Sequence, residues 1–322
     1  MTAERQSHAA RPTDLVALVT FDDEVRENQA VTLEGLSDRD RNKTRPLNAA
    51  LAQWLHLGRR MWVNVQGREV RGIATARDLN AKSAWAIDTL IDAAGADAAD
   101  EVVEDLLGQA LEAAVQARVT HVLLRTLDDA PARAPAMRAG FRPALVERLW
   151  RGVLRADPVD EPSIALRPAT AADELALFQM YNRAIPVEAR TLLGMTREEW
   201  SAVRDRRWLR GSTELVAERD GVVAGRVALQ DAGDRIQFEM LVASDDAASA
   251  GALLAEIATR ADGREVLSLT PRCAGAVETA LAEAGLEPEA REYVQLCRRM
   301  ARPVMAEAPV RAGMPVPSGG GA

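Results

Sequence analysis

Side chains able to do nucleophilic or metal chemistry are few in this sequence, and they stand apart from one another. His56 and His121 are solitary, since no second histidine, cysteine or carboxylate stands at the spacing of a metal site, and His8 lies in a polar start. The two cysteines, Cys273 and Cys297, are too few for a disulfide framework. We expect both thiols to pack as small hydrophobic groups, and we expect no metal site.

An arginine-rich stretch over 197–210 is a further candidate for holding a ligand. It leaves two interpretations open. The guanidinium groups hold an acidic ligand or partner, or the stretch is an amphipathic helix that buries Trp200, Val203 and Trp208. The helix is the simpler interpretation, because apolar residues recur along it at near-helical spacing.

The elements that must position these residues occur twice in the same order. The first half predicts a strand at 15–19, a helix at 36–58, a hairpin at 61–76, a strand at 84–91, a helix at 98–117, a strand at 121–125, a short helix at 131–139 and last strands at 141–154. The second half predicts strands and helices at 163–167, 173–181, 196–207, 214–229, 235–242, 247–261, 265–269, 273–284 and 292–300. Gly72 corresponds to Gly225, and Leu106-Leu107 to Leu253-Leu254, so the period indicates a domain duplication.

The repeat and the composition of the connecting segments set the expected domain limits. We expect a disordered start over 1–14, a first domain over 15–155, a linker over 156–162, a second domain over 163–301 and a disordered tail over 302–322. The linker is rich in proline and acids, and the tail ends in a glycine run. We expect the two domains to meet near the linker, each with a mixed sheet of its own flanked by helices.

Composition excludes several classes of protein. The net charge is −8, which is the wrong sign for a nucleic-acid binder. No apolar run approaches the roughly 20 residues of a membrane helix. The first ten residues are polar and lack the apolar stretch of a secretory signal. We therefore expect a cytoplasmic protein without nucleic-acid or membrane partners.

Two segments of the second half carry a family resemblance. Ile164-Ala-Leu-Arg-Pro-Ala-Thr-Ala-Ala-Asp173 resembles the opening strand and helix cap of a GNAT domain, the acyl-CoA-dependent N-acyltransferase family. Leu215-Val-Ala-Glu-Arg-Asp-Gly-Val-Val-Ala-Gly225 resembles the hairpin of that family. The first half shows the same element order from about Trp62. The resemblance implies an α/β fold, a mixed-sheet GNAT-like domain duplicated in tandem, similar in layout to the two-domain mycothiol synthases.

The resemblance also implies where a cofactor would lie. In the family the fourth strand splays from the fifth, and the next helix begins at the gap. A Gln/Arg-x-x-Gly-x-Gly/Ala loop there brings backbone N–H groups to the pyrophosphate of acyl-CoA. The matching positions hold Ala98, Glu101 and Val103 in the first half, and Asp245, Ala248 and Ala250 in the second; a shift of one residue gives Asp246, Ser249 and Gly251. Both loops are therefore eroded.

Carboxylates stand at or beside both loops, where the pyrophosphate would lie. Asp97, Asp100 and Glu101 stand at one loop, and Asp245 and Asp246 at the other. Their charge would repel a pyrophosphate, whereas carboxylates in a first helical turn complement the helix dipole. Helix capping is thus favoured over an unusual cofactor loop.

The resemblance assigns catalytic roles to few residues. The family's base is commonly a glutamate on the fourth strand, and Glu239 occupies that strand, with Asp88 as its counterpart in the first half. A solvated or arginine-paired carboxylate is the alternative interpretation of both. The family's tyrosine acid is replaced by Ala136 and Leu281.

Two functions remain open at this point. The favoured one is a non-catalytic derivative that binds a small ligand or a protein partner and needs no cofactor. The alternative is an active acetyl-CoA-dependent N-acetyltransferase on a small amine, with the C-terminal half catalytic. In that case Glu239 is the base and the backbone of Val242, Ala248, Ala250 and Gly251 holds the acetyl-CoA.

Overall fold

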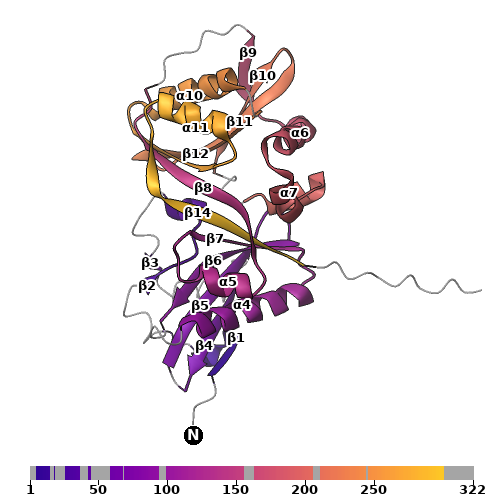
Figure 1. Cartoon of the computed structure of the whole chain (residues 1–322), viewed down its shortest axis with the longest axis vertical. Coiled ribbons are helices and arrows are strands. Elements are labelled where there is room, and N and C mark those ends of the chain that lie inside the picture. Colours follow the sequence, from indigo (N-terminus) through magenta and orange to yellow (C-terminus); the bar gives the residue numbers. More distant parts are fainter. Residues whose placement is uncertain are drawn as a thin grey trace, which may run out of the picture.

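The computed structural model describes residues 5–14, 18, 26–36, 43–44, 59–67, 69–93, 99–155, 163–205, 211–243 and 246–300. The expected linker at 156–162, the expected tail at 302–322 and most of the helix expected at 36–58 lie outside these described residues. Figure 1 shows two α/β halves stacked along the long axis of the molecule.

The elements follow the duplicated order in both halves. The first half contains β1 (Arg5–Ala9), η1 (Pro12–Asp14), β2 (Arg26–Glu27), α2 (Leu33–Leu36), β3 (Lys43–Thr44), β4 (Arg59–Gln66), β5 (Glu69–Asp78), β6 (Ala84–Asp92), α4 (Ala99–Gln116), β7 (His121–Leu127), α5 (Arg133–Arg138) and β8 (Arg142–Gly152). The second half contains β9 (Ile164–Pro168), η3 (Ala171–Asp173), α6 (Glu174–Ala184), α7 (Val187–Leu193), α8 (Arg197–Val203), β10 (Thr213–Arg219), β11 (Val222–Asp231), β12 (Arg235–Val242), α10 (Ala247–Ala261), β13 (Glu265–Pro271), α11 (Gly275–Glu283) and β14 (Glu287–Arg299). The α/β class and the duplicated element order predicted from the sequence are confirmed.

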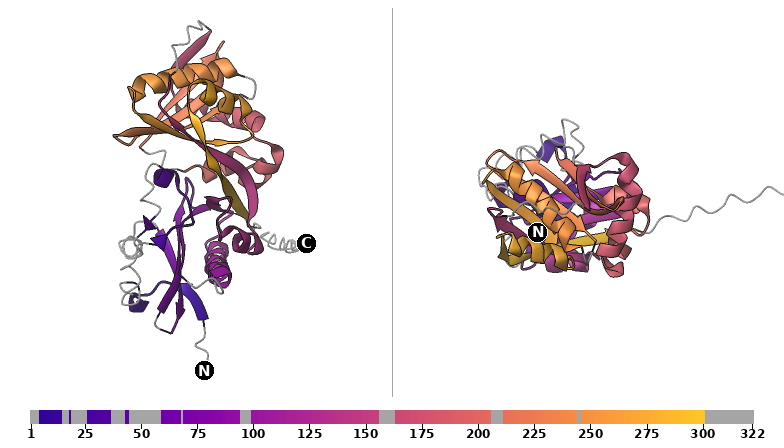
Figure 2. Two further views of the ribbon diagram at one scale, coloured as in Figure 1. Left: turned by 60° about the vertical axis from the view of Figure 1, so that its left-hand side comes forward. Right: turned by 90° about the horizontal axis from the view of Figure 1, so that it is seen from above.

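The two halves exchange their last strands. The main sheet has twelve strands in the order β1-β4-β5-β6-β7-β14-β8-β13-β12-β11-β10-β9. Strand β14, the last of the second half, pairs antiparallel with β7 of the first, while β8 pairs antiparallel with β13 of the second. The two exchanged strands also pair with each other. They run side by side through the middle of the molecule in Figures 1 and 2.

This exchange corrects one expectation. We expected each half to have a sheet of its own, and this is wrong, because β8 and β14 join both halves in one continuous sheet. The domain limits at 15–155 and 163–301 stay predictions. The last strand of each half, β8 or β14, pairs with a strand of the opposite half.

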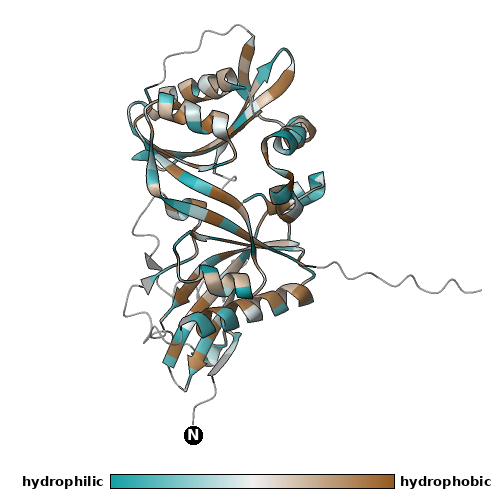
Figure 3. Cartoon of the chain, in the orientation of Figure 1, coloured by the Kyte–Doolittle hydropathy of each residue, from teal (hydrophilic) through white to brown (hydrophobic). Residues whose placement is uncertain are grey.

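The exchange also determines which residues complete each hydrophobic core. Helix α4 buries Leu106 and Leu107 on the first half of the sheet, and Leu296 of β14 belongs to that same core. Helix α10 buries Leu253 on the second half, where Trp150 of β8 joins the core. Figure 3 shows the brown and teal alternation along α4 that an amphipathic helix requires. Each core therefore depends on a strand from the other half.

Equivalent glycines allow the two long helices to approach the hairpins. A Cβ atom added to Gly72 of β5 would lie 2.6 Å from Cγ1 of Val102 in α4. The same addition at Gly225 of β11 would lie 3.0 Å from Cδ1 of Leu253 in α10. The close packing of helix on hairpin is thus a shared feature of the duplicated halves.

The start of the chain differs from expectation. Disorder was expected over 1–14, but residues 5–9 form β1, which pairs antiparallel with β4 from Arg5↔Gln66 to Ala9↔Trp62. The backbone N–H of Ser7 also donates to the carboxylate of Asp105 in α4, at 3.2 Å. The strand forms despite its polar sequence because the edge of β4 supplies backbone hydrogen-bonding partners.

Candidate functional site

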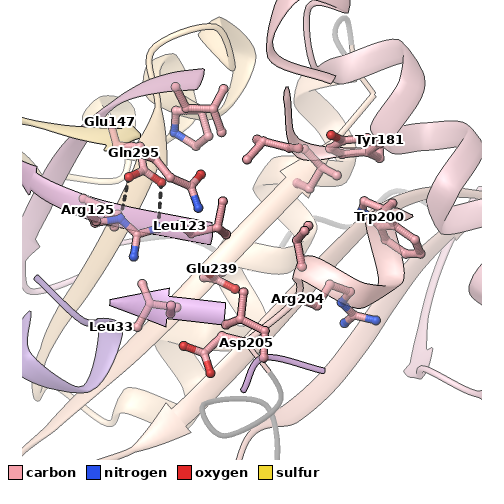
Figure 4. Close-up of a pocket in the computed structure, with 18 of the residues that line it drawn as sticks. Leu33, Leu123, Arg125, Glu147, Tyr181, Trp200, Arg204, Asp205, Glu239 and Gln295 are labelled. Carbon is pink, nitrogen blue, oxygen red and sulfur yellow. Dashed lines mark hydrogen bonds and ion pairs between the residues drawn. The ribbon is translucent and has the colours of Figure 1, made fainter. Parts of the chain in front are cut away.

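A cavity of about 230 Å³ lies between the two halves and is lined by residues from both. Figure 4 shows Arg125, Glu147 and Glu239 on the strand side of this cavity and Tyr181 and Trp200 on the helical side. The charged lining residues are Arg77, Arg125, Glu147, Arg204, Asp205, Arg226 and Glu239. The apolar lining includes Leu33, Leu79, Leu123, Leu145, Leu177, Met180, Leu193, Val203, Met240, Leu241 and Leu269.

Neighbouring parallel strands diverge at the same place in each half. Strand β6 pairs with β7 only from Ala84↔His121 to Ile87↔Leu124. Strand β12 pairs with β13 only from Arg235↔Glu265 to Phe238↔Ser268. The next residue is Asp88 on β6 and Glu239 on β12. Each half thus has a gap between two strands, and an acidic residue stands where each gap begins.

In the first half, the chain itself fills the gap. The backbone N–H of Gln29 donates to the carbonyl of Leu90 on β6 (2.9 Å), and that of Val31 donates to the carbonyl of Arg125 on β7 (2.8 Å). The intervening Ala30 is fully buried in the core of this half. Residues 28–31 therefore bridge the two strands where their own pairing has ended.

The side chain of Asn28 fixes this segment in place. Its amide nitrogen donates to the backbone carbonyl of Asp88 (3.0 Å), and its carbonyl oxygen accepts from the N–H groups of Leu90 (2.8 Å) and Ala30 (3.0 Å). The side-chain oxygen of Gln29 accepts from the N–H of Ala132, just before α5, at 2.6 Å. The backbone groups that the strand gap exposes are satisfied within the protein.

In the second half, the corresponding gap opens into the cavity. Glu239, Met240 and Leu241 of β12 line the cavity, and so do Leu269 and Pro271 of β13. In the part of the chain that the structure describes, no other segment makes main-chain hydrogen bonds to both strands beyond Phe238 and Ser268. The open gap and the filled gap are the main difference between the two halves.

The two acidic residues at the gaps differ in their partners. Asp88 is buried, accepts a hydrogen bond from the Thr75 hydroxyl (2.5 Å) and forms ion pairs with Arg59 (2.9 Å) and Arg77 (3.7 Å). Within the described residues, no hydrogen bond or ion pair holds the Glu239 carboxylate. Burial raises the pKa of Glu239, against the opposing charges of Arg226 and Arg125. Asp88 fits the paired interpretation, whereas Glu239 is available to a ligand.

The arginines of the cavity are held by carboxylates. Arg125 donates from Nε (2.6 Å) and Nη2 (3.1 Å) to the two oxygens of Glu147. Burial lowers the pKa of Arg125, but Glu147 offsets it and the net pKa is raised, so the guanidinium stays charged. Arg204 and Arg226 share Glu214 at 3.0 and 2.9 Å.

A further ion pair crosses the cavity from one half to the other. Arg77 of β5 binds Asp205, which follows α8, through both Nη atoms at 2.7 and 2.5 Å. Arg77 is almost fully buried, and an arginine in such a place keeps its charge when it is paired. This pair holds the segment after α8 against the first half.

An aromatic cluster forms the helical side of the cavity. The rings of Phe178, Tyr181 and Trp200 lie with centroids 5.8–6.3 Å apart. Trp200 was expected to be a core residue of the arginine-rich stretch, and it is buried; Trp208 lies outside the described residues. The Tyr181 hydroxyl is buried without a hydrogen-bond partner in the described structure, and burial raises its pKa.

The start of α10 carries its own carboxylate. Asp246 is the N-cap: its oxygens accept from the Ser249 N–H (2.9 Å) and the Ser249 hydroxyl (2.7 Å). Arg219 pairs with the same carboxylate at 3.1 Å. Helix capping, the interpretation favoured from the sequence, describes Asp246 correctly.

The start of α4 is also acidic, but its carboxylates face outward. Asp100 and Glu104 pair with Arg138 of α5, Asp100 at 2.7 Å. Glu101 is exposed and Val103 is buried in the core. Ala98 and Asp97 of this loop, and Asp245 of the other, lie outside the described residues.

The predicted site residues fall in different environments. Glu239 lines the cavity, on the face of β12 opposite Phe238, as expected from the strand alternation. Val242 and Ala250 are buried in the core of the second half, whereas Ala248 and Gly251 are half-buried on α10. The backbone N–H of Ala250 donates to the carbonyl of Asp246 at 3.3 Å. A role for these four residues in holding acetyl-CoA stays a prediction.

Sequence reasoning missed several cavity residues. Arg125 and Glu147 lie on different strands, 22 positions apart, and nothing in the local pattern links them. Residues 28–33 show no strand or helix periodicity, so their place in the first gap had no local signal. In the described parts of the chain, no helix is long and apolar enough to cross a membrane, and no group of possible metal ligands was found.

Comparisons with known proteins identify the fold. No family model matches the sequence, and no curated protein matches it. A GCN5-related N-acetyltransferase from Sphaerobacter thermophilus is 16% identical at a TM-score of 0.50, over 92% of this chain and 95% of that one. A GCN5-related glucosamine N-acetyltransferase region of a fungal multi-domain GH3 β-N-acetylglucosaminidase is 11% identical at a TM-score of 0.53, over 92% of this chain and 38% of that one. A tandem GNAT protein from the clavulanic acid biosynthesis pathway is 16% identical at a TM-score of 0.49, over 92% and 98%.

The first two of these matches, together with the duplicated element order, bear out the resemblance read from the sequence. At such low identity the likeness concerns the fold and not the activity. The chain therefore has the fold of the GCN5-related N-acetyltransferases, in a tandem form.

Proposed function

We propose that this protein is a non-catalytic derivative of the GCN5-related N-acetyltransferase fold that binds a small ligand between its halves and does not use acetyl-CoA. One observation carries the proposal. At both positions where the resemblance implies a cofactor, groups of the chain itself are in place. Residues 28–31 lie in the first gap, and the Asp246 carboxylate caps the helix beside the second.

The cap at α10 opposes a pyrophosphate in two ways. The Ser249 N–H, one of the first-turn donors, is already bound by Asp246. A charge-assisted hydrogen bond contributes about 1.5–3 kcal/mol, and losing this one corresponds to roughly 10–10² in affinity. The Asp246 charge adds repulsion, which the ion pair with Arg219 reduces but does not reverse.

The cavity favours a small molecule over a protein partner. Its volume is about 230 Å³, and strands line one side of it and helices the other. Pockets for drug-sized ligands span roughly 300–1,000 Å³, so this one suits a smaller compound. Its apolar wall, with polar and charged groups gathered on the other side, resembles the usual lining of a small-molecule site.

A turnover assay tests the non-catalytic proposal. The protein is incubated with acetyl-CoA and a panel of small amines, and release of free thiol is followed. We expect release at the rate of spontaneous hydrolysis. Thiol release that requires both protein and amine, and that saturates with each, would contradict the proposal.

The alternative is an active N-acetyltransferase whose catalytic half is the second. Glu239 favours it, because the carboxyl lies at the open gap and its pKa is raised toward the range useful to a general base. If the assay detects turnover, Glu239→Gln should reduce it by roughly 10²–10⁴. Unchanged turnover in that variant would exclude Glu239 as the base.

A further inference from the structure

Two of the three carboxylates that line the cavity have an arginine partner, and the third has none in the part of the chain that the structure describes. Glu147 is held by Arg125, and Asp205 is held by Arg77. Glu239 has no such partner among the described residues. Glu239 is half-buried. A carboxylate in such a place gains from a cation that arrives with its own hydrogen-bond donors, because partial burial otherwise penalises its charge.

Arg125 has an edge that its internal partner does not use. Glu147 takes the Nε and Nη2 donors, while Nη1 makes no hydrogen bond to any residue that the structure describes. A guanidinium group binds a second carboxylate through its remaining edge. Gln295, whose side chain lies beside Glu147 in Figure 4, also lines the cavity.

The other two arginines share one partner. Glu214 binds both Arg204 and Arg226, so an anion there would lie next to a carboxylate that is already in place. Burial and the neighbouring Arg226 also lower the pKa of Arg204. Glu239 thus offers a ligand a carboxylate, Arg125 offers a free guanidinium edge, and the uncharged Tyr181 hydroxyl and Gln295 amide also line the cavity.

The opposite side of the cavity is apolar. Leu177, Met180, Tyr181 and Trp200 line it from α6 and α8. Burying an apolar group of a ligand there is favourable, because it removes apolar surface from water. A ligand that matches both sides carries its charged groups at one end and an apolar group at the other.

We infer that the cavity binds a free α-amino acid with an apolar side chain. Its ammonium contacts Glu239, its carboxylate contacts the free edge of Arg125, and its side chain lies against Tyr181 and Trp200. A zwitterion adds no net charge to the cavity, whereas a simple amine or a simple acid would satisfy only one of the two groups. The inference rests on the proposed function, since it names the ligand class of the same cavity.

Calorimetric titrations with three matched compounds test the inference. Leucine carries both charges, 3-methylbutylamine lacks the carboxylate, and 4-methylpentanoate lacks the ammonium. We expect leucine to bind at least tenfold more tightly than either analogue, since each analogue loses the charge-assisted hydrogen bonds of one charged group. Equal affinity for leucine and the amine, or no binding of any of the three, would overturn the inference.

Variants identify the groups responsible. Glu239→Gln keeps the shape of the side chain. We expect it to weaken the binding of leucine at least tenfold and to change the affinity for 4-methylpentanoate by less than twofold. Glu287→Gln, at an exposed position on β14 away from the cavity lining, is the matched control and should leave both affinities unchanged. If Glu239→Gln binds leucine as the wild type does, the ammonium assignment is wrong.

The outcomes separate this inference from the proposed function. Binding of the amine alone, with no binding or turnover of acetyl-CoA, would refute the amino acid and leave a non-catalytic binding protein. Saturable acetyl-CoA turnover would refute the proposed function whatever the amino acid does.

Discussion

The two halves share an order of elements, but the gap between their parallel strands is filled in the first half and open in the second. In the first half, residues 28–31 bridge β6 and β7, and Asp88 at the gap is ion-paired. In the second half, β12 and β13 diverge into a cavity, and Glu239 has no partner in the described structure. The difference shows that a duplicated domain can keep its core and its element order while one copy closes its binding gap.

The segments before the central hairpins account for much of this difference. In the first half, the region between β1 and β4 contributes the 28–31 segment. In the second half, the region between β9 and β10 forms α6, α7 and α8, whose side chains line the cavity instead. Loops and added helices thus decide function on a scaffold whose sheet is unchanged.

The largest expected effect comes from separating the halves. Residues 1–155 and 163–301, expressed alone, each lose the exchanged strand that completes their core, β14 or β8. We expect neither fragment to show a cooperative urea transition, followed by circular dichroism. The control is the full chain cut within 156–162, which should stay associated and unfold cooperatively. A sigmoidal transition for either isolated fragment would contradict the exchange.

Substitutions at the two equivalent glycines test how closely the long helix packs on the hairpin in each half. Gly72→Ala places a methyl group 2.6 Å from Val102, and Gly225→Ala places one 3.0 Å from Leu253. We expect both to lower the free energy of unfolding by about 1–3 kcal/mol, the first more than the second. Gly108→Ala on α4 is the control, because a Cβ atom added there has no atom within 4 Å. It should raise the free energy of unfolding by about 0.5–1 kcal/mol. The reverse order of the first two would show that α10 packs more tightly than α4.

The filled gap depends on Asn28. Asn28→Ala removes its three hydrogen bonds and leaves the Leu90 N–H without that partner. We expect a loss of about 1–2 kcal/mol in urea unfolding, with faster hydrogen exchange at Leu90 and Val31. Asn80→Ala removes exposed hydrogen bonds to Ser201, and it should lower the free energy of unfolding by less than Asn28→Ala does. Slow exchange at Leu90 in the Asn28 variant would mean that the gap is held by other contacts.

Sequence patterns predicted the duplication because it is repeated in turns, glycines and helix faces. They did not predict the strand exchange, because β7 pairs equally well with β8 or β14 on hydrophobic alternation alone. The face of Glu239 followed from the period of β12. That Glu239 has no partner in the described structure could not be predicted, because the partner of a cavity side chain comes from a distant strand, as Glu147 does for Arg125.

The smallest expected effect concerns the unpaired carboxyl. Burial raises the folded-state pKa of Glu239 above the unfolded value of about 4.3, so the folded state prefers the protonated form. Its ionisation therefore lowers stability as pH rises above that value. Glu239→Gln should raise the melting temperature at pH 7–8, and the difference should shrink toward pH 4. A variant less stable than the wild type at pH 8 would indicate that a partner stabilises the ionised carboxylate.

The central claim is that groups of the chain itself take the place of acetyl-CoA in both halves. A calorimetric titration of the full chain with acetyl-CoA at low salt, where electrostatic terms count most, tests it directly. The account predicts no saturable binding, or a dissociation constant weaker than about 50 μM, which corresponds to roughly −6 kcal/mol. A dissociation constant below that value would contradict it and would favour the second half as a working cofactor site.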